Sequence, residues 1–166
     1  IVLIYRNSKR IGRYIDMNVI GFDFGTTNST ISFYNTETKT LDCFQTSASS
    51  TDYIPTVVAY KGNEVCIGDI AKKNLTKKGY ESYEHFKLRL GSDANTVIEN
   101  KSKTPTQVTA DYIRELLSEY RHEQNLDAID GIVMTVPETW FREESNRTAR
   151  ENITRSLVSP LSERIV

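Results

Sequence analysis

A short polar turn between two apolar runs constrains the fold of this chain more than any other stretch. It lies within Val19–Tyr34, whose letters are VIGFDFGTTNSTISFY. Because successive side chains of an extended strand point to opposite faces, the alternating apolar residues of the first run share one face. These residues are Ile20, Phe22 and Phe24. The other face has one carboxylate, Asp23, and we expect Gly21 to leave open space beside it. The stretch predicts a strand, a tight turn and a second strand.

The turn itself, Gly25-Thr26-Thr27-Asn28, has the composition of an anion site. It offers a glycine free to take a positive φ, two hydroxyls, an amide and consecutive backbone N–H groups. A run of N–H donors in a turn forms a concave nest for phosphate oxygens. Asp23 precedes this nest, and Mg²⁺ usually binds one or two carboxylates together with substrate phosphates. The alternative is an ordinary hairpin turn, in which glycine and asparagine bind nothing.

Composition narrows the class of protein. With 166 residues, 38% of them hydrophobic, the chain is long enough for one globular domain with its own core. A net charge of -1 gives no case for binding nucleic acid or an anionic membrane surface. No apolar run approaches the roughly 20 residues of a membrane span. We recognise no signal peptide, which favours a cytoplasmic location.

Cysteine and histidine spacing gives no metal motif. Cys43 and Cys66 form no CxxC pair, which favours two reduced, structural thiols. Neither His85 nor His122 has a second histidine four residues later, so there is no zinc signature.

The rest of the chain alternates strand and helix patterns. A threonine cap, a proline at the first helical position and a glutamine three residues after the cap start a helix at Thr104-Pro105-Thr106-Gln107. The apolar run GIVMTV before Pro137 indicates a strand buried on both faces. We predict strands at 19–24, 29–35, 40–44, 56–60, 64–67 and 131–136, and helices at 70–75, 105–123 and 138–155.

Residues 1–16 differ in character from the hairpin and the segments after it. They begin with a short apolar run and then become basic, and the run is too short for the core of a signal peptide. Met17 stands immediately before the hairpin, so we expect it to be the true initiator. Residues 1–16 would then be a leader, a tag or an upstream read-through that is poorly ordered or packs irregularly.

The stretch IGFDFGTTNS closely resembles the first phosphate-binding hairpin of the DnaK-type, seventy-kilodalton heat-shock chaperones, which are actin-like ATPases. The later letters IPTVV and IGD resemble that family's segment leading into its outer subdomain. FKLRLG resembles the family segment in which one lysine reaches the γ-phosphate and the attacking water. Lys87 is the match and Arg89 the runner-up. On chemistry alone, both would be ordinary surface cations.

Val133–Pro137 resembles the family's strand ending in TVP. In the family, this proline and a downstream arginine transmit the nucleotide state to the substrate-binding domain. Pro137 matches directly, and Arg147 is the candidate arginine, although it lies two residues farther from the proline than usual. The alternative for Pro137 is a plain strand terminator, and both interpretations stay open.

The resemblance covers roughly residues 17–155 and is weakest over 90–104. It implies an α/β fold, the ribonuclease-H-like first lobe of an actin-like ATPase, with a mixed sheet and flanking helices. The implied division is a base subdomain at 17–45 plus 105–158, a smaller inserted α+β subdomain at 46–104, and an unplaced tail at 159–166.

The resemblance also implies a function, that of an ATP-hydrolysing molecular chaperone. Gly25, Thr26, Thr27 and Asn28 would cradle the phosphates of ATP or ADP, and Asp23 would orient hydrated Mg²⁺. Lys87 would position the attacking water, since positioning and charge stabilisation carry most of phosphoryl transfer. The implied partners are unfolded client polypeptides and co-chaperones, with no nucleic acid and no membrane.

The family's second phosphate-binding turn, adenosine contacts and peptide-binding domain do not occur within these 166 residues. We therefore expect an N-terminal fragment that alone binds ATP weakly and is inactive. Two alternatives remain. One is a non-catalytic protein-interaction module on an actin-like ATPase scaffold. The other is a fragment of a cytoskeletal actin-like protein, which shares the hairpin but lacks the FKLRLG-type lysine segment.

Overall fold

The computed structural model describes residues 2–6, 18–90, 95–136, 147 and 151–153. Its elements are β1 (Val2–Arg6), β2 (Val19–Phe24), β3 (Asn28–Asn35), β4 (Thr40–Cys43), β5 (Ile54–Pro55), β6 (Val57–Lys61), β7 (Glu64–Ile67), α1 (Gly68–Asn74), β8 (Glu81–Glu84), the 3₁₀ helix η2 (Phe86–Arg89), α2 (Pro105–Glu123) and β9 (Gly131–Thr135). The predicted α/β character is confirmed. Among the described residues, no helix has the length and apolarity needed to cross a membrane.

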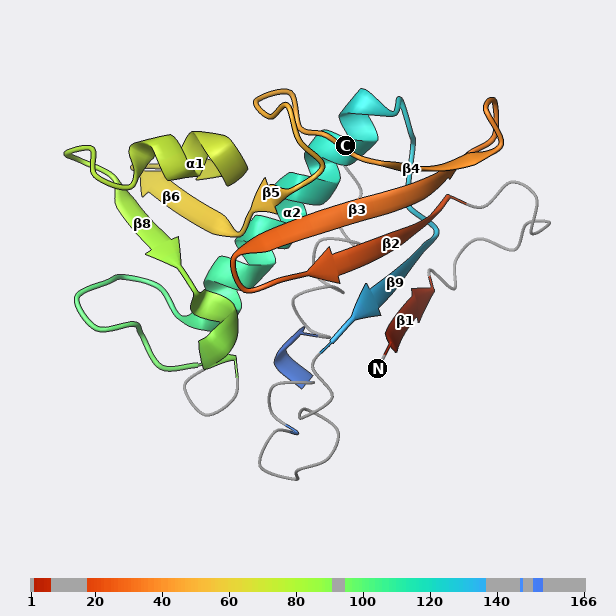
Figure 1. Ribbon diagram of the computed structural model, residues 1–166. Helices are drawn as coiled ribbons and strands as arrows, with labels where there is room; N and C mark the ends of the chain where they lie inside the picture. Colours follow the sequence, from red (N-terminus) through yellow and green to blue (C-terminus); the bar gives the residue numbers. More distant parts are fainter. Residues whose placement is uncertain (1, 7–17, 91–94, 137–146, 148–150, 154–166) are drawn as a thin grey trace.

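The larger sheet is mixed, as predicted. Its strand order is β1-β9-β2-β3-β4, and β5 pairs with β3 beside this path. β2 is antiparallel to β3 but parallel to β9 (Figure 1). In this register Asp23 lies opposite Thr30 on one side and Thr135 on the other. The carboxyl ends of β2 and β9 therefore lie side by side.

Helix α2 covers the apolar face of this sheet. The alternating residues of β2 are buried as predicted, and the Phe24 ring centroid lies 6.0 Å from that of Tyr112 on α2. The helix begins with the predicted capping box, in which Thr104 and Gln107 each accept a hydrogen bond from the other's backbone N–H. The sheet and α2 thus form the main core.

A smaller sheet, in the order β7-β6-β8, lies between the two helices. Its central strand is buried on both faces. Val58 and Tyr60 belong to the main core beside α2, whereas Val57 and Ala59 pack with Ala71 of α1 in a second cluster. The strands predicted at 56–60 and 64–67 are confirmed as β6 and β7, which pair antiparallel. The short helix starts two residues earlier than predicted, and β8 and η2 are elements that the local patterns did not predict.

The N-terminal residues differ from the irregular packing expected of them. β1 pairs antiparallel with β9 in a regular ladder from Val2↔Thr135 to Arg6↔Gly131. A run of β-branched and aliphatic residues suits a strand, and β9 offers it an edge on which to pair. Whether residues 1–16 are a leader stays a prediction, and Met17 lies outside the described residues.

The predicted helix over 138–155 is described at 147 and 151–153, which are helical. Ile153 is buried in the main core, and the Asn152 side chain donates a hydrogen bond to the Leu90 carbonyl at 3.3 Å. The rest of that helix, Pro137 and the tail at 159–166 lie outside the described residues.

Candidate functional site

The predicted site residues of the hairpin lie together at one end of the larger sheet. Asp23 is exposed on the face of β2 opposite the core, one residue before the strand ends. The turn follows directly, with Gly25 and Thr26 half-buried and Thr27 and Asn28 exposed. One carboxylate and a polar turn are therefore accessible side by side, an arrangement compatible with a phosphate and its bound cation.

Two glycines have a different role from the one expected. Gly25 is free to take a positive φ but does not adopt one, whereas Gly62, Gly68 and Gly79 do. A Cβ at Gly25 would instead collide with the carbonyl oxygen of Asn28, so the turn needs glycine for close approach. The open space expected beside Gly21 is wrong. A Cβ there would lie 2.5 Å from Oγ of Ser32, which fills that position.

Two buried hydroxyl groups, those of Ser29 and Thr56, form a hydrogen-bonded brace that supports the turn. Thr56, between β5 and β6, donates from its N–H to the Thr27 carbonyl at 2.8 Å and from its Oγ1 to the Gly25 carbonyl at 3.0 Å. Oγ of Ser29 lies 2.9 Å from the same Oγ1. Ser29 and Thr56 are each 1% exposed. Sequence reasoning missed this brace, whose only signal is a threonine inside the apolar run IPTVV.

Lys87 reaches the hairpin from a distant part of the sequence. It lies on η2, two residues after His85, whose left-handed conformation (φ 55°, ψ 16°) turns the chain at the end of β8. Lys87 Nζ donates a hydrogen bond to the Phe24 carbonyl and lies 5.0 Å from the Phe24 ring centroid. Its side chain is 9% exposed, whereas Arg89, the runner-up, is exposed. The structure thus brings Lys87 to the residue that separates Asp23 from the turn.

The charge of Lys87 is set by two opposing effects. Burial lowers the pKa of Lys87, because removing the ammonium group from water disfavours its charged form. The negative charge of Asp23 acts in the opposite direction and raises the pKa. The two groups therefore interact electrostatically, which places a cation and an anion at the same end of β2.

The donor set fits magnesium bound through water and phosphate. Asp23 is the only carboxylate among the predicted site residues, and its neighbours in the turn offer hydroxyl, amide and N–H groups. Within the described ranges, no group of three histidine, cysteine, aspartate or glutamate side chains forms a metal cage. Mg²⁺ suits such a site because it keeps several waters and binds one or two carboxylates with substrate phosphates.

The structure does not test the coupling roles predicted for Pro137 and Arg147. Pro137 lies outside the described residues. Arg147 is exposed and forms an ion pair with Glu151 one helical turn later, with Nε 3.0 Å from Oε1.

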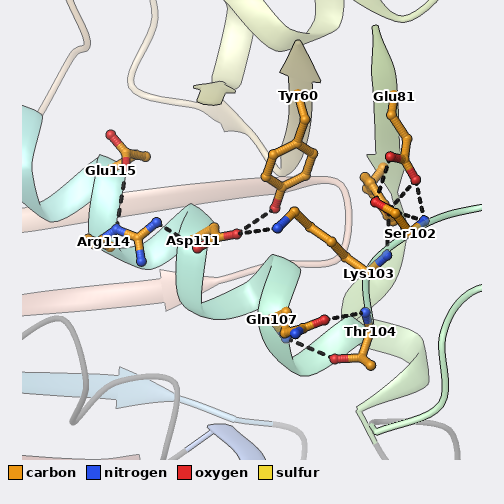
Figure 2. Close-up of polar contacts among 10 residues, drawn as sticks. Tyr60, Glu81, Ser102, Lys103, Thr104, Gln107, Asp111, Arg114 and Glu115 are labelled. Carbon is orange, nitrogen blue, oxygen red and sulfur yellow. Dashed lines mark hydrogen bonds and ion pairs between the residues drawn. The ribbon is translucent and has the colours of Figure 1, made fainter. Parts of the chain in front are cut away.

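A second polar cluster joins the smaller sheet to α2 (Figure 2). The Tyr60 hydroxyl donates to Oδ2 of Asp111 at 2.8 Å, and Arg114 donates to Oδ1 at 2.6 Å. Nζ of Lys103 lies 3.7 Å from Oδ2. Burial raises the pKa of Tyr60, and the Asp111 carboxylate raises it further. These residues line a polar cavity of about 520 Å³. The Asp111 carboxylate thus accepts two hydrogen bonds and forms an ion pair with Lys103, and its bond from Tyr60 fixes the smaller sheet against the helix.

A comparison with known protein families found a matching family model. The family model described as Hsp70 protein matches residues 19–111. The match covers more than half of the 166 residues and includes the hairpin, Thr56 and Lys87.

Proposed function

The chain belongs to the Hsp70 protein family, and from this membership we propose that its β2–β3 hairpin and Lys87 form one wall of a chaperone's ATP site. Members of the family generally bind ATP or ADP with Mg²⁺, and also client polypeptides and co-chaperones. We propose the same ligands and partners for this chain. The larger sheet would be the ribonuclease-H-like base of the ATP site, and the protein would be located in the cytoplasm.

One observation carries the proposal. Asp23, the turn after it and Lys87 come from two segments about 60 residues apart in sequence, yet they meet at the carboxyl end of β2. In open α/β sheets, ligands bind outside the carboxyl ends of strands. A turn with a structural role alone would not require a nearly buried lysine to donate a hydrogen bond to the carbonyl of the residue before it, Phe24.

Each residue has a distinct role in the proposed mechanism. The N–H groups and side chains of Thr26, Thr27 and Asn28 hold the β- and γ-phosphate oxygens. Asp23 would hold hydrated Mg²⁺ through its water, and the cation would supply charge neutralisation at the phosphates. Lys87 supplies a fixed positive charge beside the γ-phosphate and orients the attacking water. It does so by exchanging the Phe24 carbonyl for a phosphate oxygen.

The described wall holds one phosphate turn. The family's adenosine contacts and second phosphate turn are proposed to come from other parts of the protein, so these 166 residues alone would bind ATP weakly and hydrolyse it little. Water entering an open half-site weakens each electrostatic contact. Pro137 and Arg147 are proposed to couple nucleotide state to the rest of the chaperone, because β9 adjoins β2 and leads directly to Pro137.

Weak binding is best tested by nuclear magnetic resonance. The ¹⁵N-labelled chain is titrated with Mg·ATP, and we expect the amide signals of residues 25–28 to move the most. Asp23→Asn should weaken the effect. The matched control is Asp42→Asn, which removes the same charge from β4 of the same sheet, where Asp42 accepts from Asn35. Equal responses from the two variants, or no response from residues 25–28, would rule out the proposed site.

A further inference from the structure

We propose that Thr135 is a positioning residue for the cation at this site, because its hydroxyl holds the Asp23 carboxylate in a fixed orientation. The inference rests on the proposed function, and it assigns a role to a residue at the end of β9 that lies outside the hairpin and the lysine segment.

The contact is short and comes from the sheet register. Oγ1 of Thr135 donates to Oδ1 of Asp23 at 2.5 Å. Hydroxyl–carboxylate bonds of about 2.5–2.7 Å are charge-assisted and stronger than neutral ones. The two residues are direct partners on the parallel strands β2 and β9, and Thr135 is the last residue of β9. The hydroxyl therefore points to Asp23 as a consequence of strand pairing.

The exposure of both residues indicates that this bond orients the carboxylate more than it stabilises the fold. Asp23 and Thr135 are both exposed, so water can replace either partner. Hydrogen bonds between exposed groups add little to the free energy of folding. The bond occupies one carboxylate oxygen, Oδ1, and so directs the other toward metal-bound water. Partners of this kind, which orient a metal-site carboxylate without touching the metal, typically contribute strongly to metal affinity.

The neighbouring lysine makes this orientation necessary. Lys87 interacts electrostatically with Asp23, and an unrestrained carboxylate would turn toward the ammonium group. A carboxylate paired in this way would no longer face the cation, and the lysine would be less available to the phosphate. Thr135 holds Asp23 from the β9 side, whereas Lys87 approaches along η2 and Phe24. The hydroxyl thus keeps the anion and the cation of the site separate.

The test uses Mn²⁺·ATP in place of the magnesium complex and the ¹⁵N-labelled chain. Mn²⁺ broadens the amide signals near it, so the Mn²⁺·ATP concentration for half-maximal broadening of residues 25–28 measures binding at the cation site. We expect Thr135→Val to raise this concentration about tenfold. Thr135→Ser keeps the hydroxyl and should stay within about twofold of the wild type. Chemical shift changes with ATP and excess chelator should be the same for all three proteins, because the hydroxyl acts on the metal.

Asp23→Asn separates failure of this inference from failure of the proposed function. If Asp23→Asn weakens Mn²⁺·ATP binding but Thr135→Val does not, Thr135 has no positioning role and the inference is wrong alone. Equal losses in Thr135→Val and Thr135→Ser would also overturn it, because the hydroxyl would then not matter. Wild-type binding by Asp23→Asn would overturn the proposed function and this inference together.

Discussion

Replacing Thr56 by valine tests the brace beneath the hairpin turn. Valine has nearly the same shape as threonine and suits an extended segment, so the substitution removes the hydroxyl and little else. Two contacts disappear, the 3.0 Å bond to the Gly25 carbonyl and the 2.9 Å bond with Oγ of Ser29. The bond from the Thr56 N–H to Thr27 is unaffected because it comes from the backbone.

The expected cost depends on burial. Each neutral hydrogen bond contributes about 0.5–1.5 kcal/mol, and a buried group left without its partner adds to the loss. Because Ser29 and Thr56 are each 1% exposed, water cannot readily replace the missing hydroxyl. We therefore expect Thr56→Val to lower the free energy of unfolding by about 2–3 kcal/mol. For a chain of this size, that corresponds to a melting temperature lower by roughly 5–10 °C.

Urea unfolding monitored by circular dichroism measures this change, and Thr56→Ser is the control. Serine keeps the hydroxyl but loses a buried methyl group, which costs about 1 kcal/mol. The valine variant should therefore be the less stable of the two. Its residues 25–28 should also exchange their amide hydrogens faster. A Thr56→Val protein within about 0.5 kcal/mol of the wild type, the range of surface substitutions, would refute the brace.

Three further predictions concern stability. Burial lowers the pKa of Lys87 in the folded state below its usual value of 10.5. Between the folded and unfolded pKa values the unfolded state binds more protons, so the stability of the wild type should rise with pH in that window. Urea titrations at several pH values, with Lys87→Met as the reference, measure this rise. Tyr60→Phe should cost about 1.5–3 kcal/mol by losing its bond to the Asp111 carboxylate, and exposed Tyr34→Phe should leave the melting temperature unchanged. Thr104→Ala should lower the free energy of unfolding by about 1 kcal/mol through loss of the α2 cap, which thermal denaturation against Thr104→Ser checks.

Sequence patterns predicted the elements that are determined by neighbouring residues in the chain, such as α2 and β2. The capping box located the start of α2, and alternation in β2 identified the buried face, because both signals lie within a few neighbouring residues. The pairing of β1 with β9 joins residues about 130 positions apart, and neither segment contains a pattern that indicates the strand with which it pairs. A strand was therefore predicted for β9 but not for β1, whose residues were expected to pack irregularly.

The candidate site shows the same division. Residues 23–28 carry their own signal, since carboxylate, glycine and hydroxyls are contiguous. Lys87 was identified through family resemblance, because a lysine in FKLRLG has no pattern that separates it from a surface cation. Thr56 and Thr135 act through hydroxyls that meet the hairpin only after the sheets form. Their roles depend on tertiary distances, which spacing along the chain does not contain.

The central claim is that Lys87 and the hairpin turn face the same γ-phosphate. An ATP analogue with an acyl group on its γ-phosphate tests this directly, because it transfers the acyl group to a lysine amine held beside that phosphate. We expect peptide mass spectrometry to find acylation concentrated at Lys87, suppressed by excess Mg·ATP and reduced in Asp23→Asn. Labelling spread over exposed lysines, such as Lys72 and Lys73 of α1, and unaffected by ATP would contradict the account.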